Sequence, residues 1–167
     1  MIIATLAISQ LVFCTTTQAS EEPLPEQSVA LTKLQELRDR ASDLTVKAMD
    51  TLGIRYKRGG ETPENGLDCS GFVRYVFKNA VGEELPRTSK EISKVGEHIE
   101  KKDLQPGDLV FYNTLRKGFS HVGIYLGDNK FIHSPSAGGK VRIESMDMGY
   151  WKKRFNGARR INEEQAK

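Results

Sequence analysis

Apolar residues recur at helical spacing in the first third of the chain. They stand three or four positions apart, which places them on one face of a helix, and Gly53 follows where a helix would end. The stripe consists of Leu34, Leu37, Ala41, Leu44, Ala48 and Leu52. The pattern predicts a helix over about 29–52.

A second helical stripe follows a loop rich in glycine and polar residues, 53–66. Asp68 precedes this stripe as a candidate N-cap, which sets Cys69 in the first turn, and Gly82 marks the end. The apolar positions are Phe72, Val73, Val76, Phe77 and Ala80. A third, shorter helix is predicted over about 88–95.

After Leu104 the hydrophobic period changes from helical to that of strands. Short segments rich in β-branched and aromatic residues are separated by turn signals such as Pro106-Gly107 and Ser134-Pro135. They are DLVFYN (108–113), HVGIYLG (121–127), KFIHSP (130–135), VRIES (141–145) and RFNGARRI (154–161). Helices followed by antiparallel strands predict an α+β domain, with N-terminal helices packed on a central sheet of about five or six strands.

Length and charge narrow the class of protein. The chain has 167 residues, which suits one domain, and its formal charge of +3 lacks the clustering typical of nucleic-acid binding. The densest basic stretch, 151–160, is interpreted as a solvated strand and turn at a surface edge. We therefore expect no nucleic-acid partner.

The first nineteen residues contain no charged side chain and end in Thr17-Gln18-Ala19, a small-x-small sequence typical of signal peptidase sites. Their apolar run is too short to span a membrane. Cys14 follows the bulky Phe13, so lipid anchoring there is not expected. The predicted organisation is a signal peptide (1–19), a flexible lead-in (20–28), a catalytic domain (29–161) and a tail (162–167), with export to the periplasm or cell envelope, or release from the cell.

Without the signal peptide the chain keeps one cysteine, Cys69. An odd cysteine in an exported protein is a buried inert thiol, half of an intermolecular disulfide, or a reactive group. The start of a helix favours the thiolate, and a neighbouring imidazole would favour it further. The chain has three histidines, and His98 lies in a charged stretch that indicates an exposed surface position.

The other two histidines, His121 and His133, belong to neighbouring predicted strands. If 127–129 forms a three-residue hairpin loop, Leu126 pairs with Lys130 and position 121 lies opposite position 135. His133 is then the diagonal neighbour of His121 on the same face, with Cα atoms about 7–8 Å apart. A two-residue loop would place the two rings on opposite faces.

These three residues form a candidate thiol hydrolase centre. Cys69 would be the nucleophile, His121 the base, and His133 the group that orients the base. His121 is the better base because Ser120 and Gly123 beside it leave open space at the sheet face. We expect a thiolate–imidazolium ion pair, while inert packing and a zinc site built from the same three residues remain alternatives.

Four ordered blocks resemble the NlpC family of bacterial cell-wall cysteine endopeptidases, which have a papain-like core. The blocks are LDCSGFVRYVF, LPRTS, LQPGDLVFY and SHVGIYLGDNKFIHSP, within a match from about 41 to 160. The resemblance implies cleavage of peptidoglycan stem peptides, at a bond between a D-glutamyl or D-amino-acid residue and a diamino acid. It implies the roles just given for Cys69, His121 and His133, and no metal or cofactor.

The resemblance also implies a set of oxyanion or substrate-binding residues. Tyr56 matches a family tyrosine that assists the oxyanion, although it could simply pack under a loop. Asp68 and Ser70 match family residues that contact the substrate, although Asp68 could serve only as a helix cap. Ser120 is also expected among the oxyanion or substrate-binding residues. Arg87 matches the family's P-R-T-S block but receives no substrate role, because the glutamine that often follows the block is absent.

Two other functional classes remain open. A papain-like acyltransferase or amidase would use the same thioester intermediate on another amide or a lipid, and a wall-binding module would need no chemistry. The chain shows no added wall-binding repeats, so confinement in the envelope or a recruiting or regulatory envelope protein would bring it to the wall. We expect a monomer whose partners are peptidoglycan stem peptides.

Overall fold

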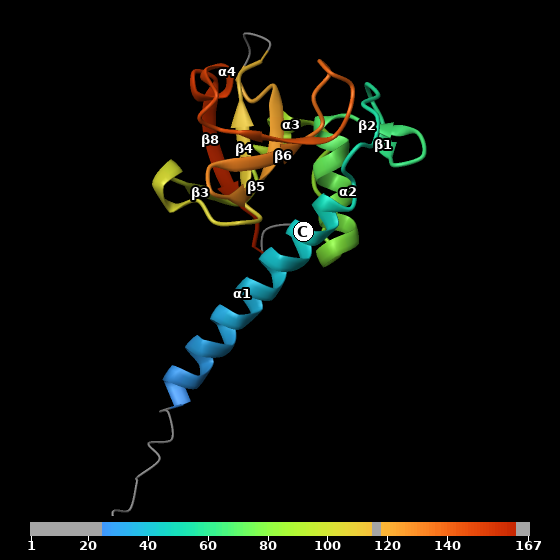
Figure 1. The fold of residues 1–167 in the computed structure, drawn as a ribbon. Coiled ribbons are helices and arrows are strands. Elements are labelled where there is room, and N and C mark those ends of the chain that lie inside the picture. The colour runs from blue at the N-terminus through green and yellow to red at the C-terminus, as the bar shows by residue number, and fades with distance from the viewer. Residues whose placement is uncertain (1–24, 115–117, 163–167) are drawn as a thin grey trace, which may run out of the picture.

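An antiparallel sheet lies at the centre of the structure, a computed structural model that describes residues 25–114 and 118–162 (Figure 1). In chain order its elements are α1 (Pro25–Met49), β1 (Glu61–Thr62), β2 (Gly66–Leu67), α2 (Cys69–Val81), α3 (Ser89–Ile92), β3 (Glu97–Ile99), a 3₁₀ turn (Lys101–Asp103), β4 (Leu109–Tyr112), β5 (His121–Gly127), β6 (Lys130–His133), β7 (Arg142–Ser145), α4 (Gly149–Lys152) and β8 (Phe155–Arg160). The sheet order is β3-β8-β4-β5-β6-β7, and α1 and α2 pack against β5. This confirms the predicted α+β class.

All five predicted strands are present, with small differences at their ends. The sheet also contains β3, a short strand that no apolar alternation marks, and which carries the exposed His98. The interpretation of 151–160 as a surface edge is wrong, because β8 lies inside the sheet between β3 and β4. The arginine side chains of β8 are nevertheless partly exposed, and Arg160 forms an ion pair with the buried Asp108.

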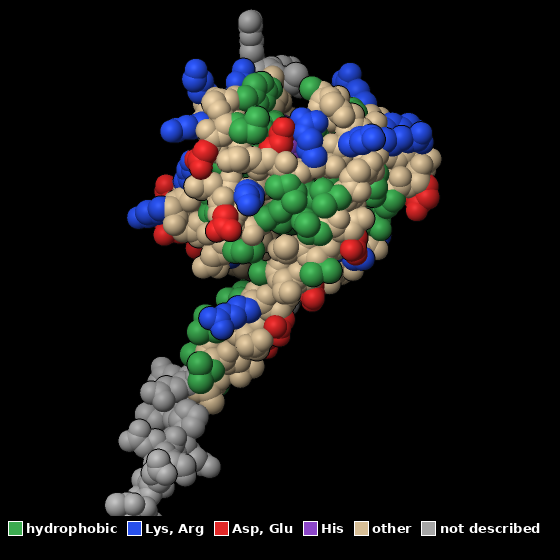
Figure 2. Space-filling model, viewed as in Figure 1, with side chains coloured by type: hydrophobic (Ala, Val, Ile, Leu, Met, Phe, Trp, Pro, Cys, Tyr) green, Lys and Arg blue, Asp and Glu red, His purple; other side chains and the backbone are tan. Residues whose placement is uncertain are grey.

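Helix α1 extends away from the rest of the molecule at its N-terminal end (Figure 1). It begins at Pro25, inside the segment predicted as a lead-in, since the fixed φ of proline suits the first helical position. Only part of the apolar stripe is covered: Leu44 and Ala48 are buried, whereas Leu34 is 55% exposed. Figure 2 shows apolar and charged side chains together along the projecting part. No described helix combines the length and apolar character needed to cross a lipid bilayer.

Helix α2 follows its predicted boundaries because both of its ends are capped. The Asp68 carboxylate accepts a 2.7 Å hydrogen bond from the Gly71 backbone N–H, and Gly82 ends the helix in a left-handed conformation with φ of 73°. Gly71 also permits a close approach, since a Cβ there would lie 2.1 Å from the Gly60 carbonyl oxygen. The apolar stripe of α2 is buried against the sheet.

The hairpin between β5 and β6 differs from prediction in its loop but keeps the expected register. Gly127 pairs with Lys130, so the loop has two residues, Asp128 and Asn129, both with positive φ as in a type I′ turn. The register then shifts between Tyr125 and Gly127, which leaves Leu126 as an extra, bulged residue. The bulge restores the pairing that places His121 and His133 on one face.

Candidate active site

Cys69 is the first residue of α2 and is half-buried beside the start of β5. Burial raises the pKa of its thiol to about 11, and the negative charge of Asp68 adds to this, although backbone N–H groups, including that of Val122, favour the thiolate. The helix start alone therefore does not make this thiol acidic. The direction of the shift is opposite to the one expected for a thiolate–imidazolium pair.

His121 begins β5 and is 6% exposed. Its Nε2 lies 2.8 Å from Nδ1 of His133, and its ring stacks on that of Trp151 with centroids 5.5 Å apart. Burial is the main cause that lowers the pKa of His121 to about 3; His133 and Arg142 act in the same direction, and Glu144 acts against them. A neutral imidazole is thus favoured beside a neutral thiol. The predicted juxtaposition of the two histidines on one sheet face is confirmed.

His133 ends β6 and is fully buried. Burial also lowers its pKa to about 3, and the Arg142 guanidinium acts in the same direction. Its second ring nitrogen, Nε2, lies 2.8 Å from Oε2 of Glu144. His121 Nε2 and His133 Nδ1 thus bind each other, and His133 Nε2 binds Glu144. Because these nitrogens already have partners, the alternative of a zinc site there is disfavoured.

Glu144 and Trp151 are site residues that the sequence reasoning missed. Glu144 comes from β7 and Trp151 from α4, and the Trp151 Nε1–H donates to Oε2 of Glu144 over 2.8 Å. The segment VRIES did indicate a strand next to that of His133. Its register could not be derived, because the connection at 134–141 is longer than the short hairpin loops whose turn type fixes strand pairing.

Arg87 joins the residues at the start of α2. Its guanidinium donates to Oδ2 of Asp68 over 2.8 Å and to the hydroxyl of Ser70 over 2.9 Å, and it also pairs with Glu61. Burial acts to raise the pKa of Asp68, but hydrogen bonds from Arg87 and from the backbone of Gly71 leave it below its usual value. The P-R-T-S block was the sequence signal for Arg87.

The two remaining predicted site residues, Tyr56 and Ser120, differ in their contacts. Tyr56 is half-buried, and burial, with the charges of Cys69 and Asp68, raises the pKa of its hydroxyl, which places it in their electrostatic neighbourhood. The hydroxyl of Ser120 accepts a 2.8 Å hydrogen bond from the Thr114 backbone N–H within the β4–β5 connection.

The expected open space at Gly123 is not present. A Cβ at this position would lie 2.8 Å from Cδ2 of Phe131 and 3.1 Å from Cβ of His133. These neighbours fill the space above the glycine. The absence of a side chain at Gly123 therefore gives room to His133 rather than to a substrate.

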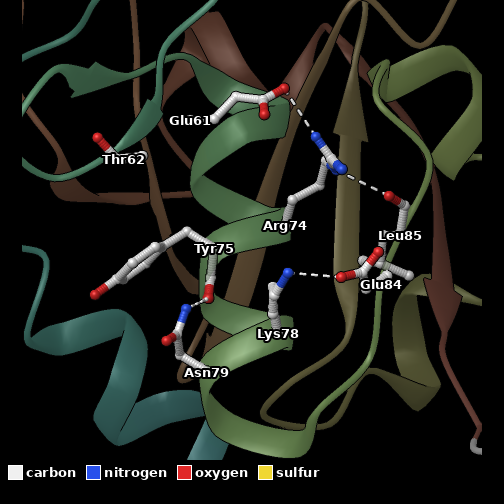
Figure 3. Close-up of a pocket in the computed structure, with 8 residues that line it drawn as sticks. All are labelled: Glu61, Thr62, Arg74, Tyr75, Lys78, Asn79, Glu84 and Leu85. Carbon is white, nitrogen blue, oxygen red and sulfur yellow. Dashed lines mark hydrogen bonds and ion pairs between the residues drawn. The ribbon is translucent and has the colours of Figure 1, made fainter.

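Two hollows differ in their relation to the histidines. One, of about 270 Å³, borders His121 and is walled by Trp151, Tyr150 and Met148, with Arg142 and Glu144 beside them. The other, of about 310 Å³, lies on the outer side of α2, where Arg74 pairs with Glu61 and Lys78 pairs with Glu84 (Figure 3). Of these two hollows, only the first borders a candidate catalytic residue, His121, because neither a cysteine nor a histidine lines the second.

The sequence is similar to those of known proteins. Residues 53–160 match the model of the NlpC/P60 family. Over 112 residues the chain is 45% identical to the murein DD-endopeptidase MepS/murein LD-carboxypeptidase of Escherichia coli (strain K12), covering 67% of this chain and 58% of that protein. It is 43% identical over 112 residues to the gamma-DL-glutamyl hydrolase of Bacillus subtilis (strain 168), covering 66% of this chain and 27% of that protein.

A solved structure shows the same fold. An NlpC/P60 family protein from Bacillus cereus ATCC 10987 superposes with a TM-score of 0.67 at 35% identity, over 72% of this chain and 39% of that one. The chain thus spans a little over half, or less, of the length of these relatives. The family match covers the segment that carries the cysteine, both histidines and Glu144. The chain belongs to the NlpC/P60 family.

Proposed function

We propose that this protein is a cysteine endopeptidase that cleaves peptidoglycan stem peptides through a thioester intermediate. The observation that carries the proposal is the 2.8 Å contact between His121 Nε2 and His133 Nδ1, next to the start of the helix that presents Cys69. A base held by a second polar group beside a nucleophile is the arrangement that thiol hydrolysis requires. Family membership supports the same chemistry.

The first half of the reaction forms the thioester. With Nε2 of His121 engaged by His133, Nδ1 remains for the Cys69 thiol. This nitrogen takes the thiol proton as the sulfur attacks the scissile carbonyl carbon, which produces a tetrahedral oxyanion. Because burial favours the neutral thiol and the neutral imidazole, proton transfer accompanies the attack rather than preceding it.

The second half releases both products. The His121 imidazolium donates its proton to the leaving amine as the carbon–nitrogen bond breaks and the thioester forms. A water molecule, deprotonated by His121, then attacks the thioester carbonyl. The carbon–sulfur bond breaks, the sulfur regains a proton, and a carboxylic acid leaves the site.

The oxyanion needs donors that are already in position. The first N–H groups of a helix have no acceptor within it, and those of Cys69 and Ser70 lie beside the Cys69 sulfur. The Tyr56 hydroxyl lies in the electrostatic neighbourhood of Cys69. We assign the oxyanion to the backbone N–H of Cys69 and the Tyr56 hydroxyl. Ser120 remains a proposed contact at the edge of the site, with its hydroxyl already engaged by Thr114.

Substrate recognition is assigned to the polar cluster at the start of α2. Asp68 keeps its negative charge because Arg87 holds it, so it can attract a substrate ammonium group. Ser70 and Arg87 offer a hydroxyl and a guanidinium for a carboxyl group. One relative is named a murein DD-endopeptidase and the other a gamma-DL-glutamyl hydrolase. For this chain we propose a bond from a D-glutamyl or other D-amino-acid residue to a diamino acid.

The cell envelope is the proposed place of action, because the proposed substrate lies there. The predicted signal peptide at 1–19, Cys14 and all but the first residue of the predicted tail at 162–167 fall outside the described residues. Action as a monomer, with recruitment by another envelope protein, stays a prediction.

The test is digestion of defined peptidoglycan fragments by the purified chain and by its Cys69→Ser variant, with released products identified by mass. We expect new amine and carboxyl termini with the native chain and none with the variant. His98→Ala is the matched control, because His98 is exposed on β3 and should leave the products unchanged. Product formation by Cys69→Ser at the native rate, or no cleavage by the native chain of fragments from several wall types, would contradict the proposal.

A further inference from the structure

A chain of hydrogen-bonding side chains crosses three adjacent strands of the sheet. His121 lies on β5, His133 on β6 and Glu144 on β7, and both contacts between them measure 2.8 Å. The β6–β7 register pairs Phe131 with Glu144 and His133 with Arg142, so His133 and Glu144 are diagonal neighbours on one face. The proposed reaction uses the two histidines but assigns no role to the Glu144 carboxylate, the last of the three hydrogen-bonded groups.

The carboxylate determines which nitrogen of each ring carries a proton. An ionised carboxylate only accepts hydrogen bonds, so Nε2 of His133 must be the N–H that faces Glu144. Nδ1 of a neutral His133 is then unprotonated and accepts from Nε2–H of His121. That leaves Nδ1 of His121 with a lone pair, as a base requires.

The reverse order of donors would disable the base. If Nδ1 of His133 donated to Nε2 of His121, a neutral His121 would carry its proton on Nδ1 and could not accept one from Cys69. Nε2 of His133 would then present a lone pair to the Glu144 oxygen, which is repulsive. Without a carboxylate at 144, both orders become accessible.

Two neighbours orient the Glu144 carboxylate by donating hydrogen bonds to it. The Trp151 indole N–H, which can only donate, reaches Oε2 over 2.8 Å, and Nε of Arg142 donates to Oε1 over 3.1 Å. The Glu144 side chain is 16% exposed. Both oxygens are therefore committed as acceptors, and the one shared by His133 and Trp151 cannot be replaced by a donor.

We propose that Glu144 is a positioning residue that fixes the protonation pattern of His133 and, through it, keeps Nδ1 of His121 free to act as base. This deepens the proposed function and rests on it for its catalytic consequence. The protonation pattern itself does not depend on that function. It can therefore be measured separately.

The first experiment measures which nitrogens carry protons, by long-range ¹H–¹⁵N correlation NMR of the full chain at neutral pH. The chain has three histidines, and exposed His98 supplies an internal reference. We expect Nε2–H on both His121 and His133 in the native protein, each in a single form. A native spectrum with Nδ1–H on His121 would overturn the proposal, whatever the enzyme cleaves.

Substitution separates a specific acceptor from general packing. Glu144→Leu removes the acceptor, and we expect a population with Nδ1–H on His121 and a kcat lower by about tenfold or more. Glu144→Gln is the conservative variant. The Trp151 N–H requires an oxygen at the shared position, so we expect its amide oxygen to restore the native pattern and most of kcat.

Controls distinguish this role from substrate contact and from loss of fold. Glu97→Leu, which removes an exposed carboxylate from β3, should change neither spectrum nor kcat. Glu144 borders the hollow beside His121, so a rise in KM at unchanged kcat would assign it to substrate binding and overturn the proposal. So would a folded Glu144→Leu protein with the native spectrum and kcat. If this variant does not fold, the native spectrum and the Gln variant still decide.

Discussion

At the residue scale, the acidity of Cys69 follows from its surroundings more than from its helix position. The helix start and several backbone N–H groups favour the thiolate, but burial and the adjacent carboxylate outweigh them. An enzyme built this way does not store a reactive thiolate in the absence of substrate. The proposed nucleophile, Cys69, and the proposed base, His121, are instead both favoured in their neutral forms.

The pH dependence of Cys69 alkylation tests this balance. We expect the rate constant with a small alkylating reagent to rise with pH well above pH 8, because burial and Asp68 raise the pKa of the thiol to about 11. In Asp68→Asn, which keeps a good helix cap but removes the charge, the midpoint should move to lower pH. Rapid alkylation that is constant between pH 6 and 8 would instead indicate the ion pair.

Gly123 is a second residue whose identity the site depends on. In Gly123→Ala the new methyl would lie 2.8 Å from the backbone oxygen of Ile132, so the β6 backbone must shift, and His133 with it. We expect a loss of about 1–3 kcal/mol in the free energy of unfolding, together with a lower kcat. Thermal denaturation and product assays would measure both. Gly149→Ala, with no heavy atom within 4 Å of the new methyl, is the matched control.

At the element scale, α1 is fixed at one end only. Leu44 and Ala48 pack into the core, and Arg40 forms a 2.5 Å ion pair with Glu83, whereas the first turns carry exposed apolar residues. A helix whose stripe is only partly covered gains stability only from its covered part. The two ends of α1 should therefore respond differently to the same substitution.

Alanine substitutions along α1 test this difference. Leu44→Ala should cost about 2–4 kcal/mol of unfolding free energy, because it removes a side chain that is 3% exposed. Leu34→Ala, at a position 55% exposed, should change it by less than about 0.5 kcal/mol. Urea denaturation of the two variants gives both values. Equal losses would mean that the N-terminal part of α1 is packed in solution.

The elements also show which features a sequence can predict. The ends of α2 were predictable because its caps, Asp68 and Gly82, act within a few residues of the chain. The projection of α1 was not, because spacing reports which residues share a face but not what covers that face. The same distinction applies to the site: Cys69, His121 and His133 have local signals, whereas Glu144 reaches them only through a strand register that the sequence does not fix.

At the scale of the whole molecule, two buried neutral histidines link folding to pH. Burial lowers the pKa of both rings to about 3 in the folded protein, against about 6.5 in the unfolded chain. Between these values the unfolded chain binds more protons than the folded protein. Stability therefore falls as the pH drops below about 6.5, and it recovers as the pH rises again.

This linkage predicts the course of acid denaturation. We expect the melting temperature to decrease as the pH is lowered from 7 to 5, an interval above the range in which most carboxylates titrate. The fall should be smaller in His133→Gln, which has one buried titrating ring fewer, and unchanged in His98→Gln, where the ring is exposed. Calorimetric scans at several pH values provide the measurement. A native melting temperature that is constant over this interval would show that the rings are not held neutral.

The bulge at Leu126 determines which evolutionary changes this segment can accept. The side chain at 126 packs against the main core cluster, and the number of residues between the two histidines is fixed, because deleting one residue would turn His133 to the opposite face of the sheet. In an alignment of relatives we therefore expect insertions and deletions to be excluded between 121 and 133. The constraint on this segment is therefore the number of residues between His121 and His133.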